Sequence, residues 1–189
     1  MKKVAIGIAG IALAAFAAGA LAQSYTVEPR HTSVVWSVNH LGTSTFRGKL
    51  NKASGKVVLD SAGKGGSVEI TVDPTGSLSG DDRLDKHLQG EDFFNPGKFA
   101  TATFKSTKIE YNGPAPSKIE GNLTLLGVTR PVTLKVERWA CRDNPMSKKP
   151  MCGGNVTATL KRTDFGMKYG VPAIGDEIRL WFSVEAYKD

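Results

Sequence analysis

The fold is decided by residues 119–137, which read IEGNLTLLGVTRPVTLKVE. Apolar side chains recur at every second position over residues 119–125 and again over residues 132–136. Alternation with period two gives a strand one apolar face and one polar face. Gly127 can adopt a turn conformation, and Pro131, which has no N–H for a ladder, is tolerated at the start of a strand. The stretch therefore predicts an antiparallel hairpin with one face against an apolar interior.

The same two-faced pattern recurs along the rest of the chain and predicts further strands. We expect them near residues 25–27, 33–40, 44–50, 55–60, 67–72, 101–111, 118–126, 131–140, 155–162 and 177–187. Turn residues separate these segments, and the sequence has no internal repeat and no linker long enough to divide two domains. Mostly sequential antiparallel strands in this number point to an all-β fold, either a closed barrel or a sandwich.

One interruption of the strand pattern, residues 79–88, has the features of a short inserted helix. Capping and acidic side chains stand at its start, and Leu84 and Leu88 are spaced to share one helical face. Residues 91–96 then end it. Because an apolar helical stripe must pack on the sheet, we expect this helix over a barrel mouth, either as a plug or as a cover for a ligand.

The amino end, residues 1–22, has the parts of a secretory signal peptide. A basic start precedes a short apolar run, and the small residues Ala20 and Ala22 fit a cleavage site before Gln23. A retained membrane anchor is the alternative, but the apolar run is shorter than the ~20 residues that a span needs. We therefore expect an exported protein, not membrane-spanning after cleavage, with one domain over residues 23–189.

The charge of the chain is a weak indicator of its partners. The formal net charge is +7. The basic residues are scattered over outward strand positions and do not alternate with aromatic residues in a patch. This pattern favours a solvated basic surface over nucleic-acid binding, and export argues further against DNA as a partner.

Cys141 and Cys152 are the only cysteines of the chain. An even number of cysteines in an exported protein predicts a disulfide. The two residues flank a polar loop, 142–151, and neither a zinc site nor a C-x-x-C redox motif can be built from them. We expect a structural staple, which the loop-entropy estimate values at about 3 kcal/mol.

The interior face follows from the alternation, and most of it should be ordinary core. A barrel of about eight strands has an interior that is either filled by side chains or open for one elongated ligand. Several inward positions carry small or polar residues, which slightly favours an open interior over a filled one: Gly48, Ala102, Ser106, Gly121 and Ala158. The residues expected to line a ligand cavity are Trp36, Val38, Phe46, Ala102, Phe104, Leu123, Leu125, Val136, Leu160, Phe165 and Phe182.

Catalytic motifs are lacking, and we expect no enzymatic activity, no cofactor and no metal site. The sequence contains no G-x-S-x-G, H-E-x-x-H or P-loop. His31 and His40 would lie far apart on opposite faces of one strand, and no carboxylate is placed by sequence to complete a metal site. His40 ends an apolar inward row, so it either bonds a ligand head group or is a satisfied structural histidine.

Three groups of motifs resemble the YceI-like family of bacterial periplasmic proteins. The first group reads YTVEPRHTS at 25–33, WSVNHLG at 36–42 and FRG at 46–48. The second reads DR at 82–83, HL at 87–88, DFF at 92–94, F at 99 and TFKS at 103–106. The third reads GNLT at 121–124, GVTRPV at 127–132 and RTDFGM at 162–167. Together they span essentially all of the chain after the leader.

This resemblance implies a periplasmic, lipocalin-like antiparallel β-barrel whose long apolar pocket holds a polyisoprenoid or related chain lipid, often in a homodimer. Two positions depart mildly from the family pattern: Glu28 stands where Asp is common, and Thr32 stands where Ser follows the histidine. The loop between Cys141 and Cys152 is not general to the family, which leaves open its effect on a dimer or on the barrel mouth.

We therefore expect a carrier of a long-chain isoprenoid or a similar amphiphilic lipid. A buried five-carbon unit contributes roughly 3 to 4 kcal/mol, so a few units exceed an association cost of about 4 to 15 kcal/mol. Quinone, prenyl alcohol, prenyl phosphate and fatty amide would bury similar surface. The polar residues expected at the mouth are His40, Arg83, His87 and Arg162. Two other functions stay open, a packed interaction module without ligand and an enzyme acting on a lipid head group.

Overall fold

The computed structural model describes residues 22–60 and 65–189, and most of these residues are in strands. The strands are β1 (Ala22–Val27), β2 (Ser33–His40), β3 (Ser44–Leu50), β4 (Ala53–Asp60), β5 (Gly66–Val72), β6 (Ser77–Leu78), β7 (Ala102–Asn112), β8 (Ala115–Leu125), β9 (Val128–Asp143), β10 (Pro150–Lys161) and β11 (Ile174–Lys188). The helical segments are η1 (Pro74–Gly76), α1 (Asp82–Leu88) and η2 (Arg162–Phe165). The expected leader lies outside the described residues except for Ala22, where β1 begins.

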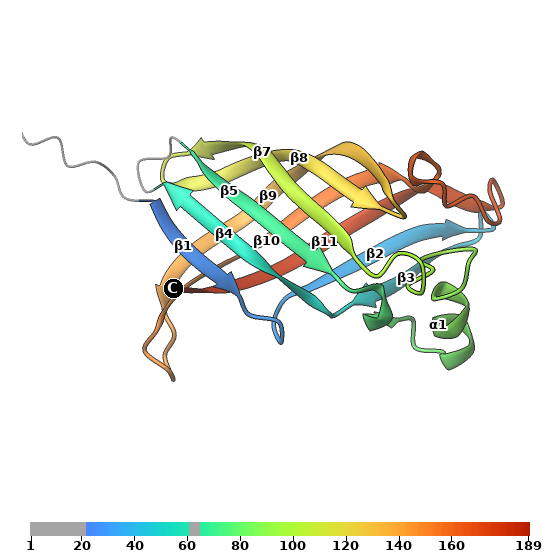
Figure 1. The fold of residues 1–189 in the computed structure, drawn as a ribbon, viewed down its shortest axis with the longest axis horizontal. Coiled ribbons are helices and arrows are strands. Elements are labelled where there is room, and N and C mark those ends of the chain that lie inside the picture. The colour runs from blue at the N-terminus through green and yellow to red at the C-terminus, as the bar shows by residue number, and fades with distance from the viewer. Residues whose placement is uncertain (1–21, 61–64) are drawn as a thin grey trace, which may run out of the picture.

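The strands form one antiparallel sheet that closes into an eight-stranded barrel (Figure 1), which confirms the predicted barrel and not the sandwich. Closure occurs where β1 pairs with the end of β11. β1 and β2 pair with successive parts of β11, while β4 pairs with β1 and β3 with β2. Therefore β1 and β2 together occupy one position around the barrel, and β3 and β4 together occupy the next.

The hairpin of residues 119–137 is confirmed as β8 and β9. Ile119 pairs with Leu134, and the two turn residues, Leu126 and Gly127, have φ angles of 52° and 73°. Positive φ at both positions is the geometry of the tight hairpin turn that suits twisted strands. β9 begins earlier than predicted, so Pro131 lies inside it. The proline is tolerated there because β10 pairs with β9 only from Lys135 onward, so this part of β9 has no second strand partner among the described residues.

The predicted helix is α1, and it lies at one end of the barrel (Figure 1). Asp81 caps it, since its carboxylate accepts hydrogen bonds from the backbone N–H groups of Arg83 at 3.0 Å and Leu84 at 2.9 Å. Leu88, its last residue, is buried. Within residues 22–60 and 65–189, no helix has the length and apolar character needed to cross a membrane.

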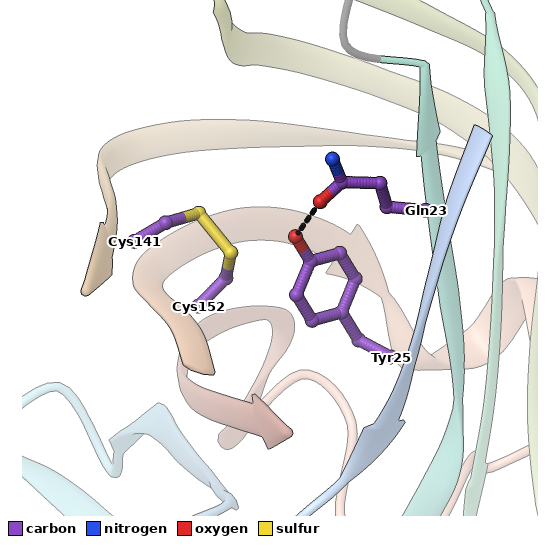
Figure 2. Close-up of a disulfide and its surroundings, with 4 residues drawn as sticks. All are labelled: Gln23, Tyr25, Cys141 and Cys152. Carbon is purple, nitrogen blue, oxygen red and sulfur yellow. Dashed lines mark hydrogen bonds between the residues drawn. A yellow bond between two sulfur atoms is a disulfide. The ribbon is translucent and has the colours of Figure 1, made fainter. Parts of the chain in front are cut away.

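The disulfide lies at the barrel end opposite α1. Cys141 in β9 and Cys152 in β10 are direct cross-strand partners, and the predicted bridge between them is present. Figure 2 shows it beside Tyr25, whose hydroxyl donates to Oε1 of Gln23 at 2.7 Å. The bridge therefore joins β9 to β10 at the end of the barrel far from α1.

Candidate functional site

An apolar cavity of about 590 Å³ occupies the barrel interior. This volume is within the range of about 300–1,000 Å³ that small-molecule sites have. Its wall draws on strands all around the barrel, for example through Val34, Val57, Ile70, Leu123, Leu134 and Leu180. In the described part of the chain, no Asp, Glu or Lys contributes to this wall. The interior thus suits a ligand that is apolar over most of its length.

Two clusters of buried side chains form the two halves of the wall. One cluster, toward the disulfide end, contains Val57 and Ile119, and the other, toward α1, contains Val34 and Leu88. The side chains that pack against both clusters include Ile70, Leu180 and Phe182. These shared residues also line the cavity, so the open space continues along the barrel from one half to the other.

Most of the residues predicted to line a cavity lie on its wall. They are Trp36, Val38, Phe46, Ala102, Phe104, Leu123, Leu125, Leu160 and Phe182. Val136 and Phe165 do not line it. Val136 packs against the cluster toward the disulfide end, and Phe165, in η2, is 2% exposed among its neighbours.

Trp139 lines the cavity although period-two reading from Val132 and Leu134 places it on the outer face. The cause is a β-bulge: Val136 of β9 pairs with Val156, whereas Arg138 pairs with Asn155, so one extra residue is inserted in β9. A bulge shifts the alternation by one position. A bulge has no dependable sequence signal, and for that reason the pattern alone does not identify Trp139.

The cavity reaches the surface at the α1 end, which we call the mouth. Tyr169, in the loop before β11, lines the cavity and is 46% exposed. Leu84, His87 and Leu88 of α1 also line it, because residues spaced three and four apart share one face of a helix. Arg83, which was predicted to lie at the mouth, is exposed and does not line the cavity, since its side chain leaves the helix from another face.

The two histidines at the mouth differ in their contacts. The His87 ring lies edge-on to the rings of Phe93 and Tyr169 at 5.0 and 5.1 Å, and its Nε2 is 3.1 Å from Oδ2 of Asp92. His40 also lines the cavity, yet its imidazole forms no hydrogen bond or ion pair with any residue that the structure describes. His40 is therefore free to bond a polar group of a ligand.

Arg162 is the one cationic side chain of the wall that keeps its charge at every physiological pH, among the residues described. It is 2% exposed, and its guanidinium donates to the carbonyl oxygens of Met167, Ile174 and Gly175 at 3.2, 2.9 and 2.9 Å. Burial lowers the pKa of this guanidinium, and the charge of Asp176 opposes the shift. The side chain thus fastens the loop before β11 and places a positive charge beside the mouth.

A second group of polar side chains lies outside the cavity, in the turn between β1 and β2. His31 Nδ1 is 2.7 Å from Oε2 of Glu28 and 3.8 Å from Oε2 of Glu185, so the fold supplies carboxylates that the sequence alone did not place. Although burial acts against ionisation, N–H groups of Arg30 and His31 lower the pKa of Glu28. These bonds give Glu28 the role of capping the turn, and they account for the cluster without a bound ion.

The wall of the cavity offers binding groups, and among the described residues we find no nucleophile paired with a base on it. Both cysteines are joined in the disulfide. In the described residues, none of the three hydroxyls of the wall, on Thr32, Ser33 and Tyr169, is hydrogen-bonded to a histidine or a carboxylate. A nucleophile without such a base is weak. The arrangement can hold an apolar chain and orient a polar head.

A family model described as YceI-like domain matches residues 25–186 of the chain. A UPF0312 protein of Shewanella putrefaciens is 35% identical over 189 residues, which cover 99% of this chain and 98% of that protein. A UPF0312 protein of Pseudomonas paraeruginosa is 34% identical over 192 residues and is matched over 100% of both chains.

Two solved structures share the fold. BcnA of Burkholderia cenocepacia superposes with a TM-score of 0.69 and 25% identity, over 85% of this chain and 99% of that one. A polyisoprenoid binding domain from Saccharophagus degradans superposes with a TM-score of 0.63 and 14% identity, over 88% of this chain and 99% of that one. The second similarity is one of fold alone.

Proposed function

This chain belongs to the YceI-like family, and on that premise we propose that it is a periplasmic carrier of a long-chain isoprenoid or a similar amphiphilic lipid. The observation that supports the proposal is the continuous cavity of about 590 Å³ with an apolar wall. A barrel of the same fold, from Saccharophagus degradans, is described as a polyisoprenoid binding domain. A binding role, in preference to an enzymatic one, also agrees with a wall that lacks a nucleophile and base pair.

The strength of such binding follows from the hydrophobic effect. Each buried CH₂ contributes about 0.8 kcal/mol, so a five-carbon unit in the cavity contributes roughly 3 to 4 kcal/mol. Association loses about 4 to 15 kcal/mol in translational and rotational freedom. A few isoprene units therefore suffice, and the apolar wall needs no specific chemistry to hold them.

The polar groups at the mouth favour a ligand whose head is an acceptor or an anion. Arg162 brings a positive charge, His40 has free ring nitrogens, and the described part of the wall contains no carboxylate. Acceptor heads such as a quinone carbonyl, a prenyl hydroxyl, a prenyl phosphate or a fatty amide meet this requirement. We place the head beside Arg162 and His40 and the chain toward the disulfide end.

Export to the periplasm is the second part of the proposal, and the disulfide supports it because such bridges persist in oxidising compartments. Protein taken from the cell envelope should begin at or within a residue or two of Gln23 and contain no free thiol. Alkylation under denaturing, non-reducing conditions followed by intact-mass measurement reads both features at once. A mass that includes residues 1–22, or two alkylated cysteines per chain, would contradict export.

Two alanines provide a matched test of whether the interior is open. Ala102 of β7 lines the cavity, whereas Ala158 of β10 is 8% exposed and does not line it. Ala102→Leu should extend into open space, so the bound chain becomes shorter or is lost while the ligand-free protein melts at the parent temperature or above. Ala158→Leu has no such space, and overpacking should destabilise the protein by about 1–3 kcal/mol.

Two measurements on each variant test this comparison: the melting curve of lipid-stripped protein gives its stability, and mass spectrometry of extracted lipid identifies the bound chain. Equal destabilisation by both substitutions, together with unchanged lipid in the Ala102→Leu variant, would show that position 102 faces packed side chains. That outcome would favour the packed interaction module.

A further inference from the structure

A glycine lies beneath the largest side chain in the mouth half of the cavity. Trp36 of β2 and Gly48 of β3 are direct cross-strand partners. A Cβ placed on Gly48 would lie 2.2 Å from Cζ2, 2.5 Å from Cε2 and 2.9 Å from Nε1 of Trp36. The indole therefore occupies the space that any side chain at position 48 would need.

The Trp36 indole is the nearest obstacle to a larger residue at position 48. The three nearest atoms to the added Cβ all belong to the Trp36 ring, and Gly48 has no positive φ that would demand glycine. A comparable pair, Phe104 over Gly121, differs in this respect, because a Cβ on Gly121 would also lie 2.5 Å from the carbonyl oxygen of Lys105. Glycine at 121 is thus required by the backbone as well, whereas at position 48 the three nearest atoms all belong to the ring.

No hydrogen bond fixes the position of the indole. Nε1 of Trp36 is buried and has no hydrogen-bond partner among the described residues, and the Phe46 ring contacts the indole at a centroid distance of 5.9 Å. One side of Trp36 lies on Gly48, and Trp36 also lines the open cavity. A side chain added at position 48 would therefore push the ring into the cavity, since that is where free volume exists.

We infer that Gly48 is a specificity-determining residue, which sets the width of the cavity by allowing Trp36 to lie against the wall and thereby admits methyl-branched chains. An isoprenoid carries a methyl branch on every unit and is wider than a straight alkyl chain. If the cavity becomes narrower at Trp36, it should exclude the branched chain before it excludes a straight one. The inference rests on the proposed function, because it concerns which lipid the cavity accepts.

The test uses mature protein that has been stripped of lipid and loaded with a fluorescent polyene fatty acid. Two alcohols, geranylgeraniol and hexadecan-1-ol, are then compared by how well each displaces the fluorescent fatty acid. Gly48→Ala should lower the ratio of the affinity for geranylgeraniol to that for hexadecan-1-ol by about tenfold, a change of about 1.4 kcal/mol. Arg47→Ala, on the exposed face of the same strand, should leave the ratio as in the parent.

A double substitution separates the steric mechanism from a general loss of structure. In a Trp36→Leu background the ring is absent, so adding Gly48→Ala should leave the ratio unchanged. The inference would be overturned if Gly48→Ala lowered the affinity ratio equally in the parent and in the Trp36→Leu background. It would also be overturned if the ratio in Gly48→Ala were equal to that of the parent.

Two further outcomes keep the inference distinct from the proposed function. A parent protein that binds neither alcohol would refute lipid binding itself. If Gly48→Ala does not fold, Trp36→Leu decides alone. If the ratio of the affinity for geranylgeraniol to that for hexadecan-1-ol in Trp36→Leu is equal to or above the parent ratio, the result supports a role of the ring in limiting the width of the cavity. If that ratio falls about tenfold, the result overturns the inference.

Discussion

Replacing Arg162 with methionine is expected to lower the free energy of unfolding by about 3 kcal/mol or more, because buried acceptors left without donors are destabilising by about 1–3 kcal/mol each. The side chain is 2% exposed, and its guanidinium serves the carbonyl oxygens of Met167, Ile174 and Gly175. Methionine fills a similar volume and can donate no hydrogen bond. The loss should appear in urea unfolding and as faster amide exchange in the loop before β11.

Two other arginine substitutions serve as controls. Arg130 is exposed and donates once, from Nε to the carbonyl oxygen of Asp164 at 3.2 Å, so Arg130→Met should change stability by less than about 0.5 kcal/mol. Arg162→Lys keeps the charge, but its three N–H donors come from one nitrogen and cannot span carbonyls that the guanidinium reaches from three nitrogens, so it should recover only part of the loss. Stability within about 0.5 kcal/mol of the parent in Arg162→Met would contradict the structural role given to this residue.

The second large effect concerns the bound chain. A ligand at about a hundredfold excess over its dissociation constant stabilises the folded state by about 2.7 kcal/mol. For a chain of this length, that energy raises the melting temperature by roughly 5–10 °C. Stripped protein should therefore melt lower than protein carrying its lipid, and geranylgeraniol should restore the difference. Geraniol, a shorter chain with the same head group, buries less surface and should restore less of it.

The regular parts of the barrel could be predicted from the sequence because alternation reports directly which face of a strand is buried. The hairpin around Gly127 is the clearest case, since both strands and the turn carry independent signals. Most of the cavity wall followed from the same alternation. Val136 was predicted to line the cavity but packs against the neighbouring core cluster instead. Trp139 was not predicted to line the cavity, because a bulge after Val136 shifts the alternation in β9.

The mouth was less predictable, because it is built from loops and a single helix. Arg83 and Arg162 look alike as isolated cations in the sequence, yet Arg83 is exposed on α1, whereas Arg162 is enclosed by the loop that it fastens. Tyr169 lies in that loop, which has no periodicity to indicate an inward face. The width of the cavity at Trp36 depends on the side chain that is missing from Gly48, so it becomes visible only in three dimensions.

The most direct measurement is mass spectrometry of the lipid extracted from protein purified without detergent, alongside the melting curves of the native and stripped forms. We expect an isoprenoid chain with an acceptor or anionic head, recovered from the parent and shortened or lost in Ala102→Leu. Recovery of no lipid from the parent, with identical melting of the native and stripped forms, would contradict the assignment of the cavity of about 590 Å³ as a lipid-binding site.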